Sequence, residues 1–263
     1  MKKPYLKKVG VFSGYKVFYV SGYWVRNNID RQFPNFGYSN NCPYIPEDEF
    51  WIDKENGKKE VRFWIDYLIA FKRFLAEGKE YSEAANLASK IEQRERSKQK
   101  SLQKIRKIKL KDKLLKKIHK KRLLKNYTNH LKIWVVRGDL VRSLFDLDFN
   151  QGGHGLVYNF IPKNEIWVDD DLYKKETPFV LIHELHEILL MKKGWKYDSG
   201  ANTGFMSRKE PKSAHFESED LEFWTREHKK STKRILLREI KKNEDFAEKE
   251  LEEESENREK LAF

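Results

Sequence analysis

One apolar stretch of the chain contains residues that can bind a metal ion. Residues 179–191 have the sequence FVLIHELHEILLM, in which nine apolar residues surround four ionisable ones. A helix that is apolar on nearly all sides is typically buried, and burying His or Glu costs free energy unless the group has a partner. His183, His186 and Glu187 share one helix face, because they are spaced i, i+3 and i+4. Imidazole nitrogen and carboxylate oxygen are both ligands that zinc accepts.

A second predicted helix, near residues 212–228, supplies further candidate ligands. We expect His183, Glu187 and His215 to hold the ion, with water as the fourth ligand. Glu219 and Glu222 follow His215 at i+4 and i+7, so they share its helix face and could bind the ion or orient a ligand. His186 is a candidate ligand or an outer partner of one.

Glu184 is the candidate catalytic residue. It lies about 100° round the helix from His183, where a general base can reach a metal-bound water. An open water position would make the site catalytic, because zinc lowers the pKa of bound water to near 7. Taken alone, a His/Glu-rich pentapeptide on a helix is also compatible with a solvated face or a salt-bridge cluster.

An internal repeat organises the chain. Shifting the sequence by 116 positions aligns residues 16–81 with 132–197 without a gap, and about 19 of about 66 positions are identical. Two copies of one unit follow from this register. Each copy is predicted to contain a strand, a short helix, two further strands and two helices. In the second copy these predictions include a helix over 138–149, a strand over 155–161, Thr177 as a helix N-cap and Gly194 as a helix C-cap.

The two copies differ where the chemistry would lie. Four residues of the second copy, His183, Glu184, His186 and Glu187, align with apolar or aromatic residues of the first. If residues 199–212 are an insertion, His215 aligns with an alanine. The aligned residues of the first copy are Tyr67, Leu68, Ala70, Phe71 and Ala85. Residues lost as a set are dispensable to the fold, so we interpret the first copy as a metal-less structural lobe.

The segment from His183 to Glu187 resembles the helix motif His-Glu-x-x-His of the zincin metallopeptidases. The resemblance covers one helix, and the fifth position is Glu187 where that motif has His. It implies zinc as the cofactor, Glu184 as the general base and a peptide or protein as the substrate. His154, in a Gly-rich loop, is interpreted as a turn or packing residue, with a role in the site as the alternative.

The fold class predicted is α+β, with two tandem homologous lobes. Each lobe is expected to have a small antiparallel sheet with packed helices, and each is followed by a long charged helix. The domains expected are a degenerate lobe over 1–92, a basic helical linker over 93–131, a lobe with the metal site over 132–229 and a charged C-terminal helix over 230–263.

The positive charge of the chain is concentrated in one segment. The formal net charge is +13. Residues 93–132 contain 17 Lys/Arg and two acidic residues, a net +15, so the remainder carries 13 − 15 = −2. The basic tract over 94–125 could bind nucleic-acid phosphates, or it could be a solvated helix or pair with the acidic run over 248–256.

The composition of the chain indicates its cellular compartment. No apolar run reaches the roughly 20 residues that span a bilayer, and no apolar segment follows the basic N-terminus as in a signal peptide. A single cysteine, Cys42, excludes an internal disulfide framework. We therefore expect a cytoplasmic protein with no membrane partner. The function predicted is a zinc-dependent, peptidase-like hydrolase; the alternative is a non-enzymatic nucleic-acid-associated or assembly protein with a structural His/Glu site.

Overall fold

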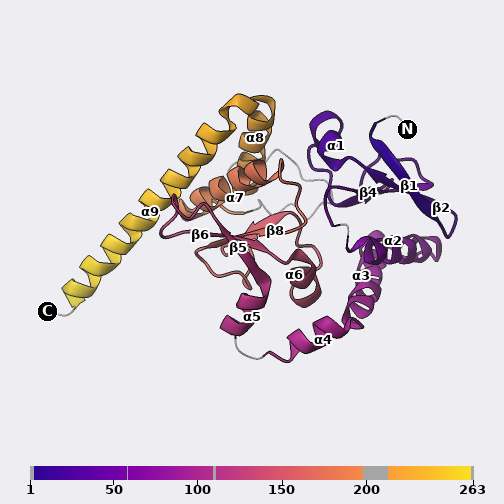
Figure 1. The fold of residues 1–263 in the computed structure, drawn as a ribbon, viewed down its shortest axis with the longest axis horizontal. Helices are drawn as coiled ribbons and strands as arrows, with labels where there is room; N and C mark the ends of the chain where they lie inside the picture. The colour runs from indigo at the N-terminus through magenta and orange to yellow at the C-terminus, as the bar shows by residue number, and fades with distance from the viewer. Residues whose placement is uncertain (1–2, 58, 109–110, 198–212, 262–263) are drawn as a thin grey trace. The chain divides into compact units, whose positions relative to one another are not determined.

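A computed structural model describes residues 3–57, 59–108, 111–197 and 213–261 (Figure 1). The chain divides into two compact units. The first comprises Met1–His119, Arg137–Asn150 and Asp169–Tyr173, and the second comprises Lys120–Val136, Gln151–Val168 and Lys174–Phe263. The predicted α+β fold with two sheet-plus-helix lobes is confirmed. The first compact unit contains residues from both copies of the repeat. The lobe boundaries at 92, 131 and 229 therefore remain a prediction.

The first unit is built on a four-stranded sheet in the order β1-β2-β4-β3. Strands β2 and β4 are parallel, whereas β1/β2 and β3/β4 are antiparallel. The sheet is therefore mixed, which corrects the expectation of a purely antiparallel one. A parallel pair needs a crossover connection, and α1 and β3 lie within it. The elements are β1 (Tyr5–Phe12), β2 (Tyr15–Val20), α1 (Gly22–Asn28), β3 (Phe36–Tyr38), β4 (Glu49–Asp53), α2 (Val61–Ala76) and α3 (Tyr81–Ser97).

The basic tract does not form one long helix, which corrects a second expectation. It is divided into the end of α3, the short helices α4 (Lys100–Arg106) and α5 (Lys111–Ile118), and the strand β5 (His119–Leu123). Strand β5 lies at the edge of the second sheet. Lysines are common on edge strands because they discourage pairing with other chains.

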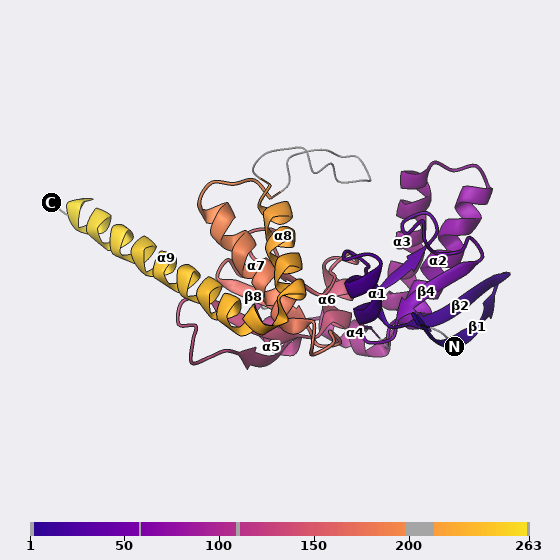
Figure 2. The same ribbon diagram turned by 90° about the horizontal axis from the view of Figure 1, so that it is seen from above.

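The second sheet has the order β5-β6-β8-β7. Helix α7 packs against α8 and α9, and α9 forms one long helix along it (Figures 1 and 2). The predicted charged C-terminal helix is therefore present. The elements are β6 (Lys132–Val136), α6 (Gly138–Leu144), β7 (Gly152–His154), β8 (Glu165–Asp169), α7 (Thr177–Lys192), α8 (Ala214–Glu227), the 3-10 turn η1 (Lys229–Ser231) and α9 (Thr232–Leu261).

The element boundaries repeat with the register found in the sequence. Helices α1 and α6, strands β3 and β7, strands β4 and β8, and helices α2 and α7 each begin and end 116 positions apart. Helices α3 and α8 end 130 positions apart, at Ser97 and Glu227. The difference of 14 residues falls on the segment interpreted as an insertion, 199–212, which lies outside the described residues.

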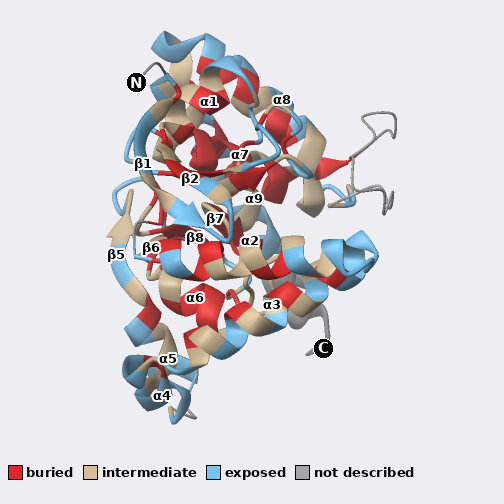
Figure 3. Ribbon diagram, turned by 90° about the vertical axis from the view of Figure 1, so that its right-hand side faces the viewer, coloured by how far each residue is buried: buried red, intermediate tan, exposed pale blue. Residues whose placement is uncertain are grey.

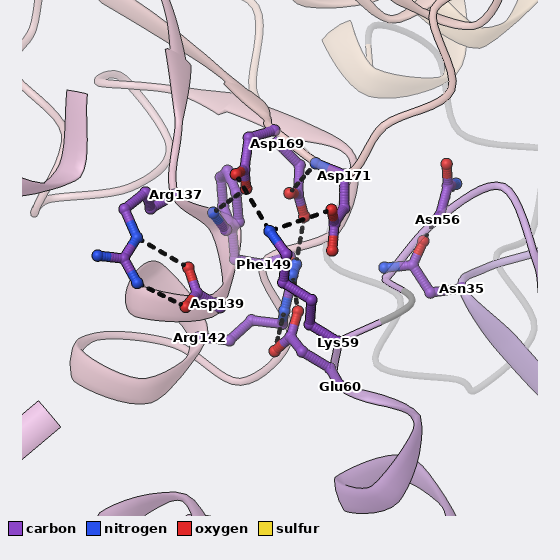
Figure 4. Close-up of polar contacts among 12 residues, drawn as sticks. Asn35, Asn56, Lys59, Glu60, Arg137, Asp139, Arg142, Phe149, Asp169 and Asp171 are labelled. Carbon is purple, nitrogen blue, oxygen red and sulfur yellow. Dashed lines mark hydrogen bonds and ion pairs between the residues drawn. The ribbon is translucent and has the colours of Figure 1, made fainter. Parts of the chain in front are cut away.

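Buried ion pairs of the scaffold are also duplicated. Arg26 donates to Asp53 at 2.8 Å and to the carbonyl of Phe33 at 3.0 Å. Its counterpart Arg142 donates to Asp169 at 2.6 Å and to the carbonyl of Phe149 at 3.0 Å, as Figure 4 shows. Each arginine thus ties its short helix to the end of a strand. The polar residues kept in both copies serve the fold, as the sequence comparison indicated.

Three local predictions need correction. Residues 155–161 are not a strand, because Val157 and Tyr158 donate backbone hydrogen bonds to the His154 carbonyl and form a turn. The short helix predicted to reach 149 ends at Leu144. Thr177 is the first residue of α7 rather than its cap; Glu176 precedes it and uses its carboxylate for an ion pair. Gly194, with φ +88°, does close α7 as expected of a left-handed C-terminal residue.

Helix α7 is buried along most of its length, as its all-round apolar sequence predicted (Figure 3). Gly152 of β7 lets the helix approach closely. A Cβ placed there would lie 2.7 Å from Val180 Cγ1 and 3.1 Å from the Trp167 carbonyl oxygen. Within the described residues, no helix has the length and apolar character needed to cross a membrane.

Candidate metal centre

Two adjacent helices of the second unit bring the predicted ligands together. Helix α7 supplies His183 and Glu187, and α8 supplies His215 from its first turn. Ser213 precedes α8 and accepts a hydrogen bond from the backbone N–H of Phe216, which fixes where the helix begins. The position of His215 beside α7 therefore follows from the cap and from the packing of the two helices.

Three ligand atoms converge on one point. His183 Nε2 lies 3.3 Å from Glu187 Oε2, and His215 Nδ1 lies 2.9 Å from the same oxygen. The two imidazole nitrogens are 3.2 Å apart. Tetrahedral zinc with bonds of about 2.0–2.1 Å holds its ligand atoms roughly 3.3–3.4 Å from one another. The triangle is close to that size without any rearrangement of the helices.

Each imidazole presents its other nitrogen to a carboxylate. His183 Nδ1 lies 3.2 Å from Glu222 Oε2, and His215 Nε2 lies 3.5 Å from Glu219 Oε1. In metal sites such carboxylates fix the tautomer and orientation of the ligating ring. The sequence predicted Glu219 and Glu222 either as ligands or as groups that orient a ligand. Their positions suit them to orient the two imidazole rings.

The orienting carboxylate Glu222 is itself held in place. Arg226 donates to Glu222 Oε1 at 2.7–2.8 Å and pairs with Glu176 at 2.6 Å. The first copy contains the same arrangement, in which Arg96 pairs with Glu60 and with Glu92. Glu222 is thus a scaffold residue whose second oxygen reaches the histidine.

His154, interpreted from sequence as a turn or packing residue, contacts the centre. Its Nε2 lies 2.7 Å from Glu187 Oε1, and its Nδ1 accepts a hydrogen bond from the backbone N–H of Leu156 at 3.2 Å. Because Nδ1 is an acceptor, Nε2 carries the proton in the neutral ring. His154, Glu184 and Glu187 lie close enough to form a second three-ligand group, but a protonated Nε2 has no lone pair for a metal. His154 instead orients Glu187.

Glu184 lies beside the three ligand atoms. It is mostly buried, and His154 Nε2 is 4.0 Å from its Oε2. Among the described residues none donates a hydrogen bond to this carboxylate. Burial, opposed chiefly by the nearby His154, raises the pKa of Glu184 to about 7. A general base works best when its pKa is close to the operating pH.

The charges of the centre favour a cation. Burial acts to raise the pKa of Glu187, but hydrogen bonds with His154, His183 and His215 hold it well below its ordinary value. Burial likewise opposes ionisation of Glu222, yet His183 and Arg226 lower the pKa of Glu222 to about 2. Burial lowers the pKa of His183, but its hydrogen bonds with Glu187 and Glu222 outweigh this and raise it. Two ionised carboxylates therefore flank His183.

His186 faces away from the centre, which corrects its inclusion among the metal ligands. Its Nδ1 lies 2.9 Å from Glu239 Oε2 of α9. Lys242 also donates to Glu239, at 3.1 Å. His186 therefore joins α7 to α9 and belongs to the packing of the unit.

The first copy fills the corresponding place with aromatic rings. Tyr38, Tyr67 and Phe71 align with His154, His183 and Glu187. The ring centroids of Tyr38 and Phe71 are 5.1 Å apart, and those of Tyr67 and Phe71 are 6.1 Å apart. Aromatic rings packed against one another need no ion to be stable in a core. One backbone scaffold thus holds an aromatic cluster in one copy and a set of candidate metal ligands in the other.

Comparisons of the chain with protein-family models, with curated proteins and with solved structures gave no significant match.

Proposed function

We propose that the protein is a zinc-dependent hydrolase whose protein ligands are His183, Glu187 and His215. The observation that carries this proposal is the triangle of ligand atoms, 2.9–3.3 Å on each side, in which every ligand has an outer partner. A structural zinc site is closed by four protein ligands, whereas a catalytic site keeps one position open for water. Three converging ligands support a catalytic site.

Glu184 is proposed as the general base. Zinc bound at the three ligands would polarise a substrate carbonyl and make a coordinated water more acidic. The Glu184 carboxylate, which accepts no hydrogen bond from the described residues, would take the proton of the attacking water and deliver it to the leaving group. His154 and Glu222 hold Glu187 and His183 in place during this transfer. The resemblance to the zincin helix favours a peptide or protein as the substrate.

A Glu184→Gln variant tests the catalytic part of the proposal. The matched control is Glu217→Gln, which makes the same change at an exposed position of α8. Zinc content should be unchanged in both variants. Hydrolysis of a mixed peptide library should fall by about 10²–10⁴-fold in Glu184→Gln alone. Equal rates in the variant and the zinc-loaded wild type, or no hydrolysis by the wild type, would overturn the assignment.

The alternative is a non-enzymatic nucleic-acid-associated protein whose His/Glu centre is structural. The observation that favours it is the group of exposed lysines on α4 and α5. Stoichiometric zinc together with no hydrolysis would support this alternative. For either function we propose a reducing, cytoplasmic compartment, supported by a single cysteine, Cys42, whose thiol is buried.

A further inference from the structure

Two short helices of the first unit expose a run of lysines. Among the described residues of 100–118 there are eight basic side chains, all exposed, and one acidic side chain, Asp112. The basic residues are Lys100, Lys104, Arg106, Lys107, Lys111, Lys113, Lys116 and Lys117. We refer to these eight as the basic surface.

The basic surface is part of the folded unit. Helices α4 and α5 both pack against α6, with Leu102 and Ile118 fully buried. Arg106 donates to the carbonyl of Ser143 at 3.3 Å, and the carbonyl of Ile118 accepts from the backbone N–H of Arg137 at 2.9 Å. The apolar side of each helix is thus used for packing, and its lysines are held on the outside.

The charge of this surface is not neutralised by neighbouring acids. Within the part of the chain that the structure describes, the seven lysines of the basic surface form no ion pair. Other lysines of the same unit do pair, such as Lys16 with Asp48 and Lys79 with Glu83. A dense and unpaired positive surface attracts polyanions and releases their bound counterions.

We propose that the basic surface binds the phosphate backbone of double-stranded nucleic acid. A membrane-binding helix needs an exposed apolar face to insert into lipid. Helices α4 and α5 instead pack against α6 and bury Leu102 and Ile118. Single-strand binding typically uses aromatic side chains that stack on bases, and residues 100–118 contain none. Lysines are point charges suited to phosphates, so binding should be independent of base sequence.

The test measures binding of the full-length protein to a short DNA duplex over a salt series. The test variant changes Lys104, Lys107, Lys113 and Lys116 to Gln. The control variant makes the same loss of charge at four exposed lysines elsewhere, Lys7, Lys8, Lys230 and Lys233. A third variant changes the four test lysines to Arg, which keeps the charge and checks that the surface tolerates substitution.

We expect the Gln test variant to lose at least about tenfold in affinity, with a log–log salt slope shallower by about 3–4. The control and the Arg variant should bind within about threefold of the wild type. Retained binding by the Gln variant, or an equal loss in the control, would overturn the proposal. So would equal or tighter binding to a single strand, to a poly-glutamate chain or to phosphatidylserine vesicles.

Discussion

The Nδ1 nitrogen of His183 lies 3.2 Å from a carboxylate oxygen of Glu222, the same residue that pairs with Arg226. Its counterpart Glu92 pairs with Arg96 in the first copy, where Tyr67 stands in place of the histidine. The carboxylate that orients the histidine is therefore common to both copies, and the histidine is not. This relationship separates the scaffold from the centre and gives matched controls in the first copy for the tests of zinc binding.

Glu222→Gln should weaken zinc binding. The neutral amide no longer fixes the charge and tautomer of His183, and loss of an outer partner typically costs about 10–100-fold in metal affinity. The control Glu92→Gln removes the equivalent scaffold carboxylate and should leave zinc affinity unchanged. Titration with a competing chelator measures both variants. Equal affinities for Glu222→Gln and the wild type would contradict the orienting role.

His154→Phe should reduce zinc affinity by about tenfold but keep the 1:1 stoichiometry, because the ring donates to Glu187 and is not itself a ligand. His154→Gln, which can still donate a hydrogen bond, should recover part of that loss. The control Tyr38→Phe alters the aligned residue of the first copy and should have no effect on zinc. Complete loss of zinc from His154→Phe would instead identify His154 as a ligand.

Glu239→Gln should destabilise the protein without changing its zinc content. Burial opposes ionisation of Glu239, but His186 and Lys242 lower the pKa of Glu239 to about 2. The ionised form therefore stabilises the fold above the ordinary glutamate pKa, and this contribution disappears as the pH falls toward 2. Denaturant unfolding at neutral pH should show a loss on the order of 1–3 kcal/mol.

Two further measurements check the Glu239→Gln prediction. The loss of stability in Glu239→Gln should shrink as the pH is lowered through about 4 toward 2. Glu248→Gln, at an exposed position of α9, should have no measurable effect. A loss that is independent of pH would show that the charge of Glu239 does not stabilise the contact between α7 and α9.

Gly152→Ala should destabilise the second unit by about 1–3 kcal/mol, because the new methyl group overlaps Val180 Cγ1. Thermal unfolding measures the change. Adding Val180→Ala removes the overlapping atom, so the double variant should be less destabilised than the sum of the single variants. Additive effects would show that the close approach of β7 and α7 is not limited by this contact.

The sequence predicted the parts of the fold that depend on local pattern. The all-round apolar stretch near His183 predicted a buried helix, and Gly194 marked its end. The short strand at His154 was missed, because its glycines have low strand propensity and are tolerated only through close packing against α7. The break in the basic tract also depends on tertiary structure, since α4 and α5 both pack against α6 and bury Leu102 and Ile118.

The residues of the candidate centre could be predicted from sequence where their side chains differ between the two copies. His183, Glu187 and His215 were found in this way, and the structure brings them together. His186 also differs from its counterpart, but its partner Glu239 lies 53 residues away and left no local signal. His154 aligned with Tyr38 and carried the same signal as the ligands, yet its Gly-rich surroundings favoured a turn.

The zinc content of purified His183→Ala compared with Tyr67→Ala tests the central claim most directly. The two changes remove aligned side chains from the same helix position in the two copies, so their effects on packing are comparable and only one removes a ligand. We predict one zinc per chain in the wild type and in Tyr67→Ala, and less than about a tenth of that in His183→Ala. No zinc in the wild type after purification without chelators, or equal zinc in both variants, would contradict it.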